Sequence, residues 1–174
     1  GWEVAGREAW REHFSTMRAL NLGFGGDSTQ HVLWRLAHGE LDNVHPKVVV
    51  LHIGTNNARH SEATPPQIAA GIRAIIESIH AKAPGAKVLL HAIFPRGAEA
   101  SDPWRQRCLE INKLLPALAD GQRVHFLDLG AKLTNADGTI GKEIMPDLLH
   151  LSAQGYGIWA GAIRPKIEAL LSAP

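Results

Sequence analysis

Cysteine is nearly absent from this sequence, which holds a single cysteine among its 174 residues. One thiol cannot build an internal disulfide framework. Cys108 falls on the apolar stripe of an expected helix, so we expect it in the core rather than at a reactive site. The chain also has no His-x-x-x-His pair, which is a common spacing of zinc ligands, so its histidines do not indicate a metal ion. We therefore expect neither a metal site nor a cofactor.

Long apolar runs and an excess of charge are missing as well. No stretch approaches the roughly 20 apolar residues of a membrane-spanning helix, so we expect no membrane span. The formal net charge is +1 and basic residues do not cluster, which argues against nucleic acid as a partner. Neither a repeat nor a linker interrupts the chain. Residues 1–174 are therefore expected to form a single domain with a sizeable core.

What the sequence does contain is a regular alternation of apolar strands and amphipathic helices. The strongest strand is expected over 48–53, with others over 87–94 and 124–129 and a weak one over 18–23. Helical spacing predicts helices over 7–14, over 29–37, between Thr64 and Pro84, from Asp102 through Leu118, and from Ser152 to Leu170. This alternation predicts an α/β fold, because parallel strands covered on both faces are joined by long right-handed helical crossovers.

The helix expected after Thr64 has the clearest signals. Thr64 can cap its first turn, and Gln67 completes a capping box with it. Five isoleucines then recur at helical spacing, namely Ile68, Ile72, Ile75, Ile76 and Ile79. The sequence therefore predicts that this helix turns a continuous apolar stripe toward the core.

Three polar segments lie at the ends of expected strands or in the loops that follow them. They are residues 23–29, residues 54–57 and residues 147–150. Parallel α/β sheets bind their ligands at the carboxyl ends of the strands. We therefore expect these three segments to converge on one pocket.

The third segment carries a candidate acid–base pair. Asp147 precedes His150 by three residues, close enough for a turn to bring the carboxylate to the imidazole. In that geometry Asp147 accepts the Nδ1–H and leaves Nε2 free to take a proton from a nucleophile. The alternative is an ordinary surface histidine beside a helix-capping aspartate. Ser152 is expected to cap the helix that follows.

The first two segments offer hydrogen-bond donors. Asn56 follows a glycine turn at a strand end, where its side-chain NH₂ can point into a crevice. Gly25 and Gly26 can present backbone N–H groups with no side chain in the way. Donors of both kinds stabilise the oxyanion that develops in acyl transfer. The alternative in each case is a plain turn former, and Asn57 is expected to hold its loop.

In this order and spacing, the motifs resemble the SGNH, or GDSL-type, hydrolases, most closely the group of the brain platelet-activating-factor acetylhydrolase catalytic subunits. The matching segments are 21–29 running into 31–36, then 54–57, then 147–152. The resemblance implies a three-layer α/β/α flavodoxin-like fold. It also implies hydrolysis of an acyl ester, with acetyl esters among the candidates, through an acyl-enzyme. Carried over, His150 is the base, Asp147 orients it, and Gly26 and Asn56 are the oxyanion donors.

The serine nucleophile of that family is not found at its usual place. The family carries it in a Gly-Asp-Ser segment at the end of the first strand, and the resemblance implies that Gly1-Trp2 lies just beyond that segment. We therefore expect an N-terminally truncated domain that lacks its first strand, is unstable and is inactive as an esterase. Ser28, in Gly26-Asp27-Ser28, is the alternative nucleophile. The competing interpretation is that Ser28 or Thr29 caps the following helix.

Two other classes of function stay open on the sequence. One is a non-catalytic interaction module of the same fold, because the resemblance admits a homodimer and scaffold partners. The other is an anion-binding flavodoxin-like domain that uses residues 23–29 as a phosphate cradle. That segment lacks the lysine of a phosphate-binding loop and the dinucleotide glycine spacing. A small-molecule acyl ester is the favoured partner, and the sequence assigns no compartment.

Overall fold

The computed structural model describes residues 4–173, and contacts within the chain group them into two units. Unit 1 is formed by the segment up to Gly25, by Phe94–Gln106, and by the chain from Leu129 onward. Unit 2 is formed by Gly26–Ile93 and Arg107–Asp128. The single domain expected over 1–174 stays a prediction, and Gly1-Trp2 lies outside the described residues.

Unit 2 contains a parallel sheet whose described strands follow the order β1-β2-β3. The strands are β1 (Val48–Leu51), β2 (Lys87–His91) and β3 (Val124–Leu127). The register places Val49 opposite Val88, and Val88 opposite Val124. The three stronger strands expected from the sequence are therefore confirmed, although each ends before its apolar run does.

The central strand β2 is buried on both faces. Val88 and Leu90 belong to the apolar core of unit 2, whereas Leu89 and His91 point to the opposite face and are equally buried. The first three residues of β1 are only partly buried, because β1 is an edge strand of the described sheet. The nearly continuous apolar run over 48–53 suggests burial on both faces for β1, but in the structure this applies to β2 instead.

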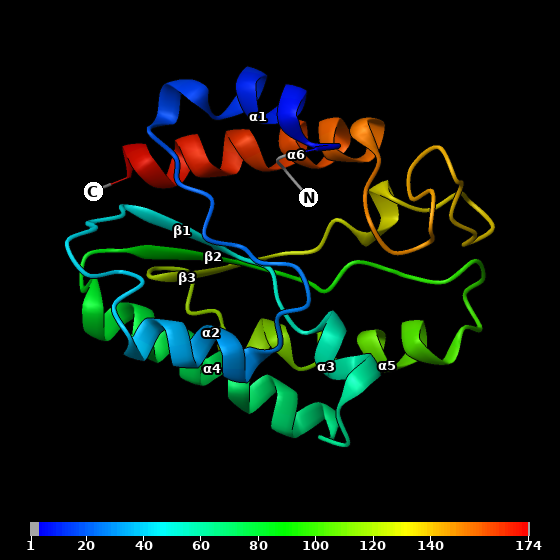
Figure 1. Ribbon diagram of the computed structural model, residues 1–174, viewed down its shortest axis with the longest axis horizontal. Helices are drawn as coiled ribbons and strands as arrows, with labels where there is room; N and C mark the ends of the chain where they lie inside the picture. Colours follow the sequence, from blue (N-terminus) through cyan, green and yellow to red (C-terminus); the bar gives the residue numbers. More distant parts are fainter. Residues whose placement is uncertain (1–3, 174) are drawn as a thin grey trace. The chain divides into compact units, whose positions relative to one another are not determined.

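The helices α2 (Thr29–Ala37), α3 (Thr55–His60) and α4 (Pro65–Lys82) lie on the same side of this sheet (Figure 1). The predicted capping box of α4 is present, with Thr64 N–H donating to Gln67 Oε1 at 2.8 Å. All five isoleucines of the predicted stripe are buried. Each stabilises the fold by roughly 1.5–3 kcal/mol relative to an exposed position.

The helix expected from Asp102 through Leu118 is divided in two. The structure forms α5 (Pro103–Asn112) and a separate 3₁₀ turn, η2 (Leu115–Leu118). Pro116 explains the division, because it has no N–H to donate to the carbonyl four residues earlier and its ring crowds that carbonyl. Cys108 is buried as expected, whereas Leu114, within the same expected helix, is exposed.

Unit 1 is built around two helices that lie side by side, α1 (Arg7–His13) and α6 (Ala153–Ser172) (Figure 1). It also contains the 3₁₀ turns η1 (Ser15–Met17) and η3 (Gly130–Lys132). Arg164 Nη1 of α6 donates to the Glu12 carbonyl of α1 at 3.2 Å. The helices expected over 7–14 and after Ser152 are confirmed.

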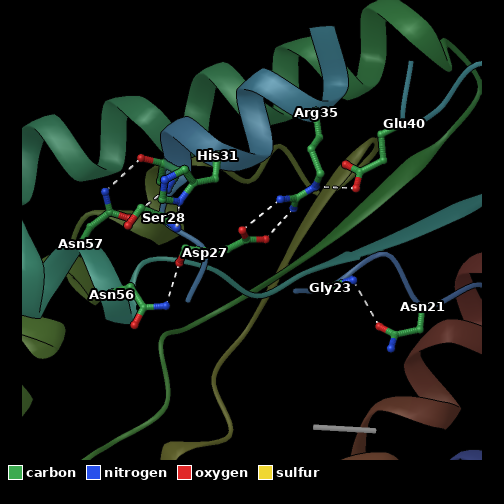
Figure 2. A network of polar contacts seen from close by, with 10 residues as sticks. Asn21, Gly23, Asp27, Ser28, His31, Arg35, Glu40, Asn56 and Asn57 are labelled. Carbon is green, nitrogen blue, oxygen red and sulfur yellow. Dashed lines mark hydrogen bonds and ion pairs between the residues drawn. The ribbon is translucent and has the colours of Figure 1, made fainter. Parts of the chain in front are cut away.

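The weak strand expected over 18–23 is not formed, and that prediction is wrong. Arg18 has a left-handed backbone with φ of 53°. The Asn21 side chain accepts a hydrogen bond from the Gly23 N–H at 3.2 Å (Figure 2). A local bond of this kind competes with a strand ladder for the same backbone group. Leu20 and Leu22, which suggested the strand, are exposed.

The segment 55–57 is also different from expectation, because it forms the first turn of α3 rather than a loop.

Among the described residues, no helix combines the length and the apolar character needed to cross a membrane. Within the same residues, no group of three or more histidine, cysteine, aspartate or glutamate side chains is placed to hold a metal ion.

Candidate active site

Gly54 sets the start of α3 and therefore the direction of the asparagines that follow it. Its φ of +121° lies in a region that side chains other than glycine rarely adopt. A Cβ at this position would also come within 2.7 Å of Ile93 Cδ1. The chain can turn from β1 into α3 here only because residue 54 has no side chain. Asn56 and Asn57 then fall in the first helical turn.

Asn57 joins α3 to the start of α2. It is buried, and its Oδ1 accepts a hydrogen bond from Thr29 N–H at 2.9 Å. Its Nδ2 donates to Thr29 Oγ1 at 3.1 Å and to Gln30 Oε1 at 3.2 Å. These bonds support the expectation that Asn57 is a structural residue. They also bring two of the predicted segments, 23–29 and 54–57, into direct contact (Figure 2).

Asn56 makes a second link between the same two segments. Its Nδ2 donates to the backbone carbonyl of Asp27 at 2.8 Å, and its side chain is only partly buried (Figure 2). An amide NH₂ carries two hydrogens. One of them is therefore engaged in holding the side chain, and the other remains for an acceptor outside this network.

The side-chain carboxylate of Asp27 is held by a charged network that we did not expect from the sequence. Arg35 donates from Nη1 and Nη2 to the two carboxylate oxygens of Asp27 at 2.9 and 2.5 Å, and from Nε to Glu40 at 2.7 Å (Figure 2). The hydrogen bond with Asp27, and to a smaller extent that with Glu40, raises the pKa of Arg35 despite the opposing effect of burial. The fork geometry of the guanidinium fixes the orientation of Asp27.

Ser28 and Gly26 complete the loop before α2. Ser28 is the N-cap residue of α2 in a reciprocal capping arrangement with His31, whose Nδ1 accepts from Ser28 N–H at 3.0 Å. Ser28 is buried, which fits the capping interpretation. Gly26 is exposed with φ of +83°, and among residues 4–173 its N–H has no hydrogen-bond acceptor. That N–H is available to a ligand.

In unit 1, the turn at 147–150 brings the predicted acid–base pair together. His150 Nδ1 and Asp147 Oδ2 are 2.6 Å apart, the distance of a strong hydrogen bond. The second carboxylate oxygen, Oδ1, accepts from His150 N–H at 2.7 Å and from Leu149 N–H at 3.1 Å. The imidazole is 74% exposed, and its Nε2 has no hydrogen-bond partner among the described residues.

This environment controls the ionisation of Asp147. Partial burial raises the pKa of its carboxyl group, but the hydrogen bonds that it accepts from the His150 ring and from the His150 and Leu149 amides outweigh that effect. The resulting pKa is about 2, below the ordinary value of 3.8. Asp147 is therefore a carboxylate at neutral pH and can hold a proton on Nδ1 of His150.

Two further features fix the backbone of this turn, and the sequence predicted only the second. Leu148, directly after Asp147, has a left-handed backbone with φ of 60°, and its carbonyl accepts from Gly97 N–H at 2.9 Å. Ser152 caps α6 as predicted, accepting from Gly155 N–H at 3.1 Å and donating from Oγ to the Glu143 carbonyl at 2.5 Å.

The structure thus assembles the predicted residues as two clusters. One cluster, in unit 2, contains Gly26, Asn56 and the capped Ser28, and the other, in unit 1, contains Asp147 and His150. Each cluster has the donors or acceptors expected from the sequence. Their convergence on one pocket stays a prediction.

The sequence matches a known family over most of its length. Residues 1–158 match the GDSL-like Lipase/Acylhydrolase family. The chain belongs to this family. Its members are hydrolases of ester bonds, so the resemblance noted from the motifs is confirmed.

Relatives and solved structures agree with this membership. The chain is 47% identical over 166 residues to platelet-activating factor acetylhydrolase IB subunit alpha1 of Bos taurus. The aligned region covers 95% of this chain and 70% of the bovine protein. A GDSL-like lipase from Bacteroides thetaiotaomicron superposes with a TM-score of 0.76 at 22% identity, over 93% of this chain and 81% of that chain. A carbohydrate acetylesterase from Sinorhizobium meliloti gives a TM-score of 0.59 at 26% identity, over 82% and 67% of the two chains. These neighbours confirm the predicted α/β fold class.

Proposed function

We propose that this protein hydrolyses acyl esters of small molecules, preferentially acetyl esters, through a covalent acyl-enzyme. The observation that carries the proposal is the 2.6 Å contact between His150 Nδ1 and Asp147 Oδ2 in a chain of the GDSL family. The pair has the arrangement of a base whose tautomer is fixed and whose second nitrogen is free. A surface histidine beside a capping aspartate needs no such short bond.

In the proposed mechanism, His150 Nε2 takes the proton of a serine hydroxyl as the serine oxygen attacks the ester carbonyl. Asp147, ionised because its pKa is about 2, accepts the Nδ1–H and stabilises the imidazolium that forms. The imidazolium then protonates the leaving alcohol. Water then attacks the acyl-enzyme and gives a proton to Nε2. The acyl group leaves as a carboxylic acid, and the imidazolium returns the proton to the serine oxygen.

The oxyanion donors we propose are the Gly26 N–H and the second Nδ2 hydrogen of Asn56. The Gly26 N–H, which has no acceptor among the described residues, and the Asn56 amide, which is anchored to the Asp27 carbonyl, support these roles. Preorganised donors need no rearrangement as charge develops, and each contributes roughly 3–4 kcal/mol to transition-state stabilisation.

The nucleophile we propose is the serine of the Gly-Asp-Ser segment that the family resemblance places ahead of Gly1, in preference to Ser28. Ser28 is buried and serves as the N-cap of α2. Using its hydroxyl for attack would remove that cap, at a cost of about 1 kcal/mol. It would also convert the proposed oxyanion loop into the nucleophile loop. On this proposal, residues 1–174 by themselves do not hydrolyse esters.

The proposed preference for acetyl esters rests on the activities for which the relatives are named. The bovine relative is an acetylhydrolase subunit and the Sinorhizobium meliloti neighbour is an acetylesterase. Both names refer to the removal of the same two-carbon acyl group, although the alcohol part differs. We therefore place the specificity of this protein on the acyl side of the ester.

Hydrolysis of p-nitrophenyl acetate, butyrate and octanoate by the full-length protein tests the proposal. We expect the highest kcat/KM with acetate, and a fall of several orders of magnitude in the His150→Ala variant. His60→Ala, at an exposed position in α3, is the control and is expected to be unchanged. Near-normal turnover in His150→Ala would reject the base assignment, and a preference for octanoate would reject acetyl specificity.

Labelling with a fluorophosphonate followed by peptide mass spectrometry identifies the nucleophile. We expect the label on a serine ahead of Gly1 and no labelling of residues 1–174 expressed alone. A label on Ser28 would overturn this part of the proposal while leaving the roles of Asp147 and His150 in place.

A further inference from the structure

Arg105 is a buried cation that plays no part in the proposed chemistry. It lies in the first turn of α5 and is 4% exposed. Its guanidinium donates to three backbone carbonyls: from Nε to Arg96 at 2.7 Å, from Nη2 to Gly97 at 2.6 Å, and from Nη1 to Gly138 at 2.5 Å. A buried charge is costly unless its donors are satisfied. Here they are satisfied by loop backbone, so the side chain fixes the position of these loops.

One of these bonds is made to the peptide group between Arg96 and Gly97, which also bonds to the turn at 147–150. The Arg96 carbonyl and the Gly97 N–H belong to the same planar peptide. Arg105 Nε–H donates to its oxygen at 2.7 Å, and its N–H donates to the Leu148 carbonyl at 2.9 Å. The peptide is therefore held at both ends. A cation on the oxygen side also polarises the N–H and strengthens the bond that it donates.

Leu148 needs such support. Its φ of 60° is a conformation that residues with a Cβ adopt at an energetic cost. Its N–H donates to the Met145 carbonyl at 2.9 Å, and its carbonyl accepts from Gly97. Leu148 connects Asp147 to the two residues whose N–H groups bind the Asp147 carboxylate. A change in its backbone would therefore move Asp147 away from His150.

Gly97 fits this arrangement in a way that another residue could not. Its φ is +75°, and a Cβ would come within 2.4 Å of Asp102 Cγ. The Asp102 carboxylate is itself engaged, accepting from Trp104 N–H at 2.9 Å and from Arg105 N–H at 3.0 Å. The same aspartate thus orients the start of α5, from which the Arg105 side chain reaches the Arg96–Gly97 peptide.

We propose that Arg105 is a positioning residue for the Asp147–His150 pair. It fixes the Arg96–Gly97 peptide, and that peptide keeps Leu148 in the left-handed conformation that brings Asp147 to the imidazole. The catalytic meaning of this role rests on the proposed function. The geometric role does not, because it concerns a hydrogen bond that can be observed without turnover.

Arg105→Lys in the full-length protein tests the proposal, and Arg107→Lys is the matched control. Arg107 lies on the same helix and also holds backbone carbonyls, those of Ser61 at 3.0 Å and Ala63 at 2.6 Å. Neither carbonyl is connected to Leu148 by a described bond. Both variants keep the positive charge and lose the planar fork that reaches several carbonyls at once.

The first readout is the low-field proton NMR signal of His150 Nδ1–H. We expect Arg105→Lys to weaken this signal and shift it upfield, and Arg107→Lys to leave it unchanged. The second readout is kinetic. Misplacement of a catalytic group lowers kcat, so we expect about a tenfold loss of kcat with KM within about twofold for Arg105→Lys only.

A suppressor separates positioning from a general loss of stability. Glycine adopts positive φ without strain, so Leu148→Gly reduces the need for the Gly97 bond. We expect Arg105→Lys to cost much less kcat in the Leu148→Gly background than in the wild type. Equal losses in the two backgrounds would overturn the proposal, as would an unchanged Nδ1–H signal in Arg105→Lys.

Amide hydrogen exchange of the wild-type protein provides a measurement that needs no variant. We expect Gly97 N–H to exchange at least tenfold more slowly than an unprotected amide, because it donates to Leu148. Free exchange at Gly97 would overturn the proposal even if Arg105→Lys failed to fold. A lost Nδ1–H signal with normal ester turnover would instead sustain the positioning role and reject the proposed function.

Discussion

The Asp27 carboxylate is held by both terminal nitrogens of Arg35, at 2.9 and 2.5 Å, while the backbone carbonyl of Asp27 accepts from the Asn56 amide at 2.8 Å. One residue thus connects a helix cation to a proposed oxyanion donor. The loop that carries Gly26 is therefore held from both sides by contacts within the chain.

Arg35→Met is expected to destabilise the protein by about 2–4 kcal/mol, because it leaves the largely buried Asp27 and Glu40 carboxylates without their partner. The side chains of Arg35 and Asp27 are only 20% and 12% exposed. Arg11→Met, which breaks the exposed pair with Glu8 on α1, is the control and is expected to change stability by less than about 1 kcal/mol. Urea unfolding of both variants measures the difference, and equal effects would contradict it.

Asn56 and Asn57 are adjacent, but replacing them with alanine is expected to have different effects. Asn56→Ala removes a proposed oxyanion donor, so we expect a loss of roughly 10²–10³ in kcat with a small change in stability. Asn57→Ala leaves buried groups of Thr29 unpaired, and we expect a loss of about 1–3 kcal/mol in stability. Steady-state kinetics and urea unfolding on the same preparations check both. A catalytic loss confined to Asn57→Ala would reverse the assignment.

Gly54→Ala is expected to destabilise the protein by about 2–3 kcal/mol, because alanine is strained at φ of +121° and its Cβ would press on Ile93. The control is Gly85→Ala, where a Cβ would meet no atom within 4 Å. There we expect no loss, and a gain of up to about 1 kcal/mol from the stiffer unfolded chain. Thermal unfolding of the two variants provides the comparison. Equal melting temperatures would show that the turn before α3 is less constrained than its geometry implies.

Asp147 is expected to contribute stability that depends on pH in the acid range. Its folded pKa of about 2 lies below the ordinary value of 3.8. The contribution is therefore fully present above the ordinary value and is lost as the pH falls through the folded value. We expect the difference in free energy of unfolding between wild type and Asp147→Asn to shrink between pH 5 and about pH 2. A difference that stays constant over this range would contradict the assigned hydrogen bonds.

The sequence predicted the elements whose signals are local. The capping box of Thr64 and Gln67 and the isoleucine stripe specify α4 without reference to the rest of the chain. The spacing of Asp147 and His150 specifies a contact that a single turn can close. In each case a few neighbouring residues contain the whole physical cause, so inspection of the sequence was sufficient.

What the sequence did not predict depends on distant partners or on backbone geometry. Arg35 and Asp27 are eight residues apart, and nothing in the spacing distinguishes Asp27 from other carboxylates as the partner of Arg35. The Arg105 guanidinium donates to backbone carbonyls, which are present at every residue and carry no sequence signal. The wrong strand at 18–23 has the same origin, because alternation of leucines cannot show whether a neighbouring strand is available for pairing.

The exposure of the imidazole at 74% has a consequence for the kinetics of this protein. A proposed base that is already exposed to water requires no opening step before it can exchange protons. We therefore expect protons to exchange between His150 Nε2 and the buffer much faster than the enzyme turns over.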